Sequence, residues 1–215
     1  AQQHAFVLGL YDVLRRIFLP RPQILLESCS SGGNRFDLGM LCYSPQIWAS
    51  DDTDPIERLD IQSGLSYLYP QSTVGAHVSA APHQQTLRDT PLSTRFNVAA
   101  FGVLGYELEL KYMTRAELKE LRGQIEFYKA HRRTLQFGRF YRFDERKGNK
   151  VHCQVSSRDG KEHIVGHFQK LCTASEGPDA LCVHDLDSKA KYHLSCKRQS
   201  LFKKRLGGLV KHVMP

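Results

Sequence analysis

The residues best suited to chemistry lie in two short polar segments. The first runs from Glu27 to Asp37 and reads Glu-Ser-Cys-Ser-Ser-Gly-Gly-Asn-Arg-Phe-Asp. Its small residues follow an apolar run, so backbone amides can approach a ligand closely, and Arg35 and Asp37 add charged hydrogen-bonding groups. Two alternatives remain open: a phosphate-binding loop, although no Gly-Lys-Ser/Thr follows, and a tight strand-to-helix turn with a conventional salt bridge.

The second segment carries three carboxylates, Asp51, Asp52 and Asp54, shortly after Trp48, which is the single tryptophan of the chain. Helix capping before Pro55 explains one of them. Like charges at one strand end repel each other and raise one another's pKa, which indicates a sugar, a metal or a proton-transfer task. A ring beside carboxylates is typical of carbohydrate sites, and a packed core indole is the alternative for Trp48.

Six cysteines predict reduced, buried thiols rather than disulfides, because the chain is long and carries no export signal. A metal site is the alternative, since a Cys-x-His pair is followed by a His-x-x-Cys pair. The short Cys-x-x-Cys spacing of structural zinc is missing, so we expect no metal and no cofactor. The four residues concerned are Cys182, His184, His193 and Cys196.

The composition is that of a folded globular protein: 215 residues, 41% hydrophobic and 24% charged. No apolar stretch is long enough to cross a bilayer, so we expect no membrane association. The net charge of +8 conceals an asymmetry, because residues 1–110 hold 7 basic and 11 acidic residues whereas residues 111–215 hold 23 basic and 11 acidic ones. The basic residues of the second half follow no recognisable binding motif, so we expect no nucleic-acid partner.

The elements that must position the polar segments alternate between strands and helices. A helix is predicted over residues 6–18, and strands over 24–28, 46–50, 74–79 and 103–108. Pro55 opens a helix whose Ile56 and Leu59 face inward, and Pro91 opens another through Phe96 and Val98. Repeated strand–loop–helix units indicate a parallel α/β fold, in which polar residues after the strand ends form the ligand site.

The second half of the chain changes character. Thr114 and Glu117 form a capping box, followed by apolar residues at helical spacing to about Gln136. After Gly138 the period becomes two, and strands are predicted over 140–143, 151–155, 163–168 and 181–183. We therefore expect an α/β domain over residues 1–137 and a β domain over 138–215.

The two polar segments and the strands after them resemble a known family. The segments Glu27–Asp37, Gly39–Leu41 and Pro45–Asp54 are closely similar to the family 36 glycoside hydrolases, the α-galactosidases of bacteria and fungi. The segments 75–79, 94–102 and 105–108 continue the likeness in the family's order. The resemblance covers residues 1–140 closely and the rest loosely.

The resemblance implies that residues 1–137 are the C-terminal half of a (β/α)₈ TIM barrel, and that residues 138–215 are part of a small antiparallel β-sandwich. It implies retaining hydrolysis of α-galactoside oligosaccharides such as melibiose and raffinose, with two carboxyl groups and no metal. Asp51 is then the acid/base. Cys29, Gly32 and Trp48 match galactose-contacting positions, with Ser30, Arg35 and Asp54 as supports.

The departures matter as well. The family's nucleophile lies in a Lys-Trp-Asp motif that this chain lacks, and a loop that reads Pro-Asn-His-Gln in relatives is Pro82-His-Gln-Gln here. We therefore expect a fragment of a larger enzyme that is inactive by itself. The resemblance implies a homo-oligomer, a tetramer, and the resemblance together with the cysteine usage implies a cytoplasmic location. The alternatives are a non-catalytic remnant and a galactosyl transglycosylase of the raffinose-synthase type.

Overall fold

The computed structural model describes residues 2–143, 149–171, 174 and 181–195. The chain divides into two compact units, Ala1–Asp185 and Leu186–Pro215, and everything that positions the candidate site lies in the first. The strand predicted over 181–183 is wrong, because these residues form no strand. No helix in the described part of the chain is long and apolar enough to cross a membrane.

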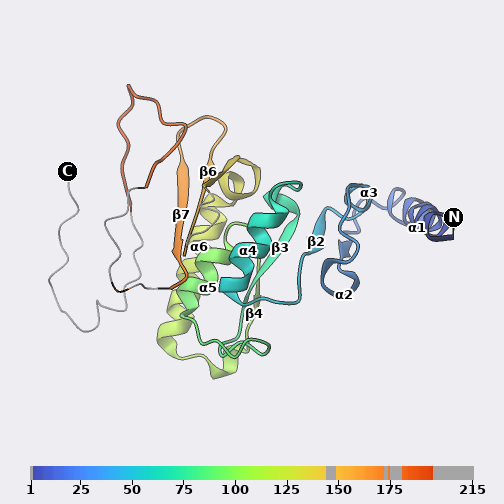
Figure 1. Ribbon diagram of the computed structural model, residues 1–215, viewed down its shortest axis with the longest axis horizontal. Helices are drawn as coiled ribbons and strands as arrows, with labels where there is room; N and C mark the ends of the chain where they lie inside the picture. The colour runs from blue at the N-terminus through green and yellow to red at the C-terminus, as the bar shows by residue number, and fades with distance from the viewer. Residues whose placement is uncertain (1, 144–148, 172–173, 175–180, 196–215) are drawn as a thin grey trace. The chain divides into compact units, whose positions relative to one another are not determined.

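A four-stranded parallel sheet is the centre of the first unit, as the repeated strand–helix pattern predicts (Figure 1). Its strands are adjacent in chain order: β1 (Glu27–Ser28), β2 (Gln46–Trp48), β3 (Val74–Ser79) and β4 (Val103–Glu107). Each of the last three strands is followed by a helix, namely α4 (Pro55–Leu65), α5 (Leu92–Ala99) and α6 (Arg115–Phe137). The α/β class is therefore confirmed.

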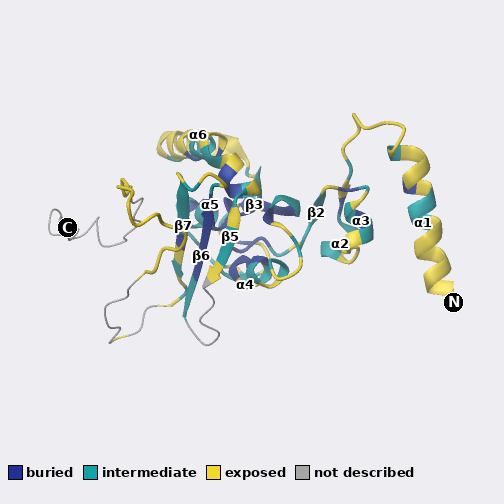
Figure 2. Ribbon diagram, turned by 90° about the horizontal axis from the view of Figure 1, so that it is seen from above, coloured by how far each residue is buried: buried dark blue, intermediate teal, exposed yellow. Residues whose placement is uncertain are grey.

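The N-terminal elements are less covered. Helix α1 (Gln2–Phe18) is confirmed but has only Leu14 buried, and most of it is exposed in Figure 2. The strand predicted over 24–28 is reduced to Glu27–Ser28, because the chain after Pro22 makes a turn in which the Ile24 amide bonds the Arg21 carbonyl. Two single-turn segments, α2 (Ser30–Gly33) and α3 (Leu38–Leu41), follow β1.

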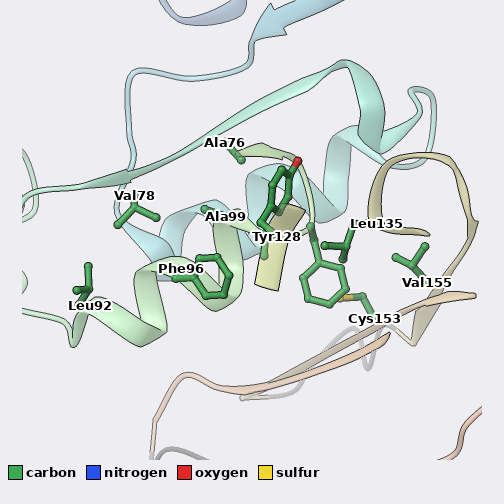
Figure 3. Close-up of a cluster of buried hydrophobic side chains, with 11 residues drawn as sticks. Ala76, Val78, Leu92, Phe96, Ala99, Tyr128, Leu135, Cys153 and Val155 are labelled. Atoms are coloured by element: carbon green, nitrogen blue, oxygen red, sulfur yellow. The ribbon is translucent and has the colours of Figure 1, made fainter. Parts of the chain in front are cut away.

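The two faces of β3 differ in chemistry. Val74, Ala76 and Val78 are fully buried and face the helices, where Ala76 and Val78 join Phe96 of α5 in the main apolar cluster (Figure 3). His77 points to the other face because successive strand residues alternate. The sheet thus has an apolar helix-covered face and a polar face, and the polar face carries the candidate site.

Helix α6 is fixed at its start and in its middle. The predicted capping box is confirmed, with the Thr114 side chain bonded to the Glu117 backbone and the Glu117 carboxylate bonded back. The Tyr128 hydroxyl donates to the Gly102 carbonyl at 2.8 Å and accepts from the Leu104 amide at 3.1 Å. These bonds attach the helix to the start of β4, and so to the sheet.

The chain then forms a separate antiparallel sheet in the order β5 (Arg139–Phe143), β6 (Lys150–Ser156) and β7 (His163–Gln169). The three predicted strands here are confirmed. Leu181 and Val183 are exposed, and no strand formed by the described residues pairs with them. Instead the buried Gln154 side chain bonds both the amide and the carbonyl of His184, which takes up backbone groups that a ladder would otherwise use. Two short 3₁₀ helices complete the described elements: η1 (Gln71–Thr73) precedes β3, and η2 (Leu110–Tyr112) follows β4.

Candidate active site

The candidate site lies at the carboxyl ends of the parallel strands. Trp48 is the last residue of β2, Ser79 the last of β3 and Glu107 the last of β4. Because all four strands run in the same direction, these ends meet at one edge of the sheet. The loops that leave this edge carry the polar segments found in the sequence.

Trp48 and Asp51 form a direct pair. The indole Nε1 donates a hydrogen bond to Asp51 Oδ1 at 2.9 Å. Trp48 is half-buried and Asp51 is exposed, so the indole is not a fully packed core residue. The bond fixes the direction in which the carboxylate points, and no hydrogen bond from the described residues occupies Asp51 Oδ2.

The turn after β1 is wound in the left-handed sense. Ser30, Ser31, Gly32 and Gly33 have φ angles of 56°, 59°, 73° and 91°, and the Gly33 amide bonds the Cys29 carbonyl at 2.9 Å. Left-handed backbone costs about 1–2 kcal/mol for each residue other than glycine. Two serines held in this conformation are the kind of local strain that gathers at functional sites.

This turn packs onto the end of β2, beside Asp51. A Cβ added to Gly33 would lie 2.6 Å from the Ala49 carbonyl oxygen, closer than any side chain fits. A Cβ added to Gly32 would lie 3.5 Å from Asp51 Oδ2. The structure therefore brings together three of the residues singled out in the sequence: Gly32, Trp48 and Asp51.

The charged end of the same segment has a different task. Asp37 caps α3 by accepting from the Met40 amide at 2.9 Å, and it accepts a second bond from the Tyr11 hydroxyl at 2.7 Å. That bond to the carboxylate raises the pKa of Tyr11 to about 12. Arg35 is exposed, and the described contacts bring neither Arg35 nor Ser30 against Asp51. An Arg35–Asp37 salt bridge is not among the ion pairs of the described residues, so that alternative is not supported.

Asp54 is a buried anchor. Its side chain is 0% exposed, and it caps α4 by accepting from the Ile56 amide at 2.8 Å, as the position before Pro55 predicts. The Thr86 hydroxyl bonds its other oxygen at 2.6 Å, and Arg88 forms an ion pair with it. Direct contact between Asp54 and a ligand therefore has no support, because both oxygens are occupied inside the protein.

The charge state of Asp54 corrects one expectation. Neighbouring acids were expected to raise one another's pKa. Burial does favour a higher pKa for Asp54, but the bonds from Thr86, the Ile56 amide and Arg88 and the Arg88 charge outweigh burial, so the pKa is lowered. Asp54 stays ionised because its partners favour the charged form.

Two residues of the polar face were missed in the sequence. His77 of β3 bonds Glu107 of β4 through Nδ1 at 2.8 Å, and its ring lies 4.5 Å from the Trp48 ring, centroid to centroid. Gly75 and Gly105 leave room for these two rings. A Cβ added at Gly75 would lie 3.2 Å from the Trp48 ring, and a Cβ added at Gly105 would collide with the His77 ring. The available signal was the alternation Gly75–His77 and Gly105–Glu107 within apolar strands.

Arg58 was also missed. It lies in the first turns of α4 with only 2% exposure, and its guanidinium bonds three backbone carbonyls around the Trp48–Asp51 pair. The signal was a charged residue next to Leu59 on the inward stripe of the helix. The expected burial of Leu59 is confirmed, whereas Ile56 is only partly buried.

The four described cysteines are all free thiols, but they are not all buried. Cys153 is buried, Cys29 is intermediate, and Cys42 and Cys182 are exposed, so the expectation of buried thiols is wrong for two of them. Cys172 and Cys196 lie outside the described residues. No group of three or more candidate metal ligands occurs among the residues that the structure describes.

Comparison with known proteins decides the family. The family model described as Melibiase matches residues 1–138, which is more than half of the chain and includes the turn, the Trp48–Asp51 pair and the whole parallel sheet. The chain belongs to the Melibiase family.

The relatives of this chain are much longer. It is 45% identical over 192 residues to α-galactosidase AgaA of Geobacillus stearothermophilus, which covers 89% of the chain and 26% of AgaA. It is 54% identical over 139 residues to α-galactosidase 1 of Pediococcus pentosaceus, covering 65% of the chain and 19% of that protein. The chain therefore spans about a quarter of the length of these relatives or less.

Solved structures of α-galactosidases are also similar to this chain. The crystal structure of AgaA from the same Geobacillus species superimposes with a TM-score of 0.83 at 46% identity, over 86% of this chain and 26% of AgaA. An α-galactosidase from Lactobacillus brevis gives a TM-score of 0.78 at 49% identity, over 81% and 24%. Variants of AgaA have been crystallised with raffinose and with stachyose.

Proposed function

We propose that the chain supplies the acid/base side of a retaining α-galactosidase site that cleaves terminal α-galactosyl units from oligosaccharides such as raffinose and melibiose. The observation that carries the proposal is the hydrogen bond from Trp48 to Asp51, with the free carboxylate oxygen facing Gly32. A fixed, solvent-accessible carboxyl group beside an aromatic ring suits proton transfer to a sugar oxygen.

In the proposed reaction a second carboxylate attacks the anomeric carbon while Asp51 gives its proton to the departing glycosidic oxygen. Asp51 then takes a proton from water, which attacks the covalent intermediate and releases galactose with retained configuration. The attacking carboxylate belongs to a part of the enzyme that this sequence does not include. The identity to α-galactosidases and the raffinose and stachyose complexes of AgaA support this substrate class.

For binding, we propose that Cys29, Gly32 and Trp48 contact galactose. The left-handed turn after Cys29 supports this, because it brings Gly32 against the Asp51 carboxylate. Ser30 and Arg35 are proposed as outer supports. Asp54 is proposed to act only through the loop that it anchors, since its carboxylate is fully engaged.

We further propose the larger context. Residues 1–137 would form the C-terminal half of a (β/α)₈ barrel, and residues 138–215 part of a β-sandwich. The parallel β1–β4 sheet and the separate β5–β7 sheet support this division. Free thiols among the described cysteines support a cytoplasmic location, and a homotetramer is proposed on the family resemblance alone.

The test joins this chain to the portion of AgaA that it does not cover, and compares that chimera with the chain alone. We expect no hydrolysis of raffinose by the chain alone and hydrolysis by the chimera. Asp51→Asn in the chimera should lower turnover of raffinose by about 10²–10⁴-fold, the usual contribution of an acid/base group. The Asn side chain keeps an oxygen that can accept the hydrogen bond from Trp48. The lowered turnover therefore measures the loss of proton transfer rather than a change in geometry.

A nitrophenyl α-galactoside sharpens the test, because its leaving group departs without needing a proton. We expect Asp51→Asn to affect formation of the galactosyl intermediate far less with this substrate than with raffinose. Asp60→Asn changes an exposed carboxylate on α4 that pairs with Lys170; it is the matched control and should change neither rate. Near-normal raffinose hydrolysis by Asp51→Asn in an active chimera would refute the role of Asp51.

A further inference from the structure

A buried cation lies directly behind the Trp48–Asp51 pair. Arg58 projects from α4 and is 2% exposed. Its guanidinium donates three hydrogen bonds, all to backbone carbonyls: from Nη2 to Ser50 at 2.6 Å, from Nε to Asp52 at 2.7 Å and from Nη1 to Gly75 at 3.0 Å. The carbonyls of Ser50 and Asp52 lie in the loop that follows β2, and Gly75 is the β3 residue that pairs with Trp48.

Two of the bonds enclose Asp51 in the sequence. The Ser50 carbonyl belongs to the peptide group directly before Asp51, and the Asp52 carbonyl belongs to the next residue's peptide group, between Asp52 and Thr53; one planar guanidinium holds both. A guanidinium presents its donors in a rigid fork, so it fixes the relative orientation of two acceptors. The backbone that directs the Asp51 side chain is therefore held from within.

The same guanidinium holds the partner of Asp51. The Arg58 Cζ atom lies 4.9 Å from the centroid of the Trp48 ring, a cation–π arrangement. Trp48 in turn donates to Asp51 at 2.9 Å. Arg58 thus contacts both ends of the pair, the ring on one side and the loop backbone on the other.

The charge of Arg58 is uncompensated at close range. Among the described residues no carboxylate forms an ion pair with it. Burial lowers the pKa of Arg58 to about 10, and the more distant charges of Asp52, Glu107 and Asp51 oppose that effect. The residue remains charged near neutral pH. A buried charge is costly unless its bonds are satisfied, and here backbone carbonyls of the site satisfy them.

We propose that Arg58 is a positioning residue, which sets the geometry of Trp48 and Asp51 by clamping the loop on both sides of Asp51 while covering the Trp48 ring. The inference deepens the proposed function, because it names what holds the proton donor in place. Arg58 itself touches no substrate in this scheme and acts through the two residues that it orients.

The chain allows a direct test, because Trp48 is its single tryptophan. A tryptophan gives a near-ultraviolet circular dichroism band only when its surroundings are fixed, whereas the far-ultraviolet signal reports secondary structure. We would compare Arg58→Met and Arg58→Lys, and measure acrylamide quenching of the Trp48 emission alongside. The expected result is loss of most of the tryptophan band and stronger quenching in both variants, with the far-ultraviolet spectrum unchanged.

Arg95 provides a matched control. It lies in α5 and also bonds backbone carbonyls, those of Thr90 and Ser79, but it does not contact Trp48. Arg95→Lys should keep the tryptophan band. If Arg58→Met does not fold, Arg58→Lys decides, because it keeps the charge but loses the forked donors.

Two results would overturn the inference: a normal band with normal quenching in the folded Arg58 variants, or an equal loss of the band in Arg95→Lys. Neither measurement requires galactosidase activity. If Asp51→Asn in the chimera hydrolyses raffinose at a near-normal rate while Arg58→Lys loses the tryptophan band, the proposed function is rejected and the positioning role of Arg58 stands. If Asp51→Asn lowers turnover while Arg58→Lys keeps the band, only the positioning role is rejected.

Discussion

The turn after β1 offers a quantitative test of how the site is assembled, through Gly33→Ala. The backbone at Gly33 has φ = 91°, and an added Cβ would lie 2.6 Å from the Ala49 carbonyl oxygen and 3.1 Å from that of Trp48. Both neighbours are backbone atoms at the end of β2, so neither can rotate away.

The cost has three parts. Forcing an alanine into this backbone region costs about 1–3 kcal/mol. The overlap with β2 adds about 1–3 kcal/mol. Replacing glycine lowers the entropy of the unfolded chain, which returns about 0.4–1 kcal/mol. The net expected loss in the free energy of unfolding is about 1–6 kcal/mol, a large share of the ~5–15 kcal/mol of a typical domain.

Urea denaturation followed by Trp48 fluorescence and by circular dichroism measures this loss. Gly123→Ala is the matched control, because Gly123 lies in α6 with nothing within 4 Å of an added Cβ. It should stabilise the protein by about 0.5–1 kcal/mol. If the free energy of unfolding of Gly33→Ala lies within ~0.5 kcal/mol of that of the unmodified chain while the control behaves as expected, the turn does not pack on β2.

Three further predictions follow from the buried and exposed groups. The pKa of Asp54 is lowered in the folded state, so its ionised form stabilises the protein above the unfolded pKa of about 3.9, and this effect is lost as the pH falls through the folded pKa. Asp54→Asn should therefore flatten the acid side of a plot of urea midpoints against pH. An unchanged slope would contradict this. Burial raises the pKa of Cys153 to about 12, so maleimide labelling read by mass spectrometry should modify exposed Cys42 first, and equal rates would show that Cys153 is accessible. Cys29→Ala in the AgaA chimera should weaken galactose binding, measured by calorimetry, and turnover that depends on a thiolate would instead assign Cys29 a chemical role.

Local signals in the sequence predicted most of the elements. Pro55 after Asp54 started α4, and the Thr114–Glu117 capping box started α6, because a helix start depends on groups a few residues apart. The strand predicted at Leu181–Val183 failed for the opposite reason. Alternating residues form a strand only when a neighbouring strand takes up their backbone groups, and none does so among the described residues.

For the site, the sequence by itself determined the polar segments, their order after successive strands, and the identity of Trp48 and Asp51 as a ring and a carboxylate near one strand end. Only the tertiary structure decided that Gly32 lies against Asp51, that Asp54 is an internal anchor and that Arg58 lies behind the pair. The physical reason is that hydrogen bonds between residues three or four positions apart, such as helix caps, depend on residue types that are close together in the sequence. Convergence of loops instead depends on parallel strand pairing and burial, which join residues far apart in the chain.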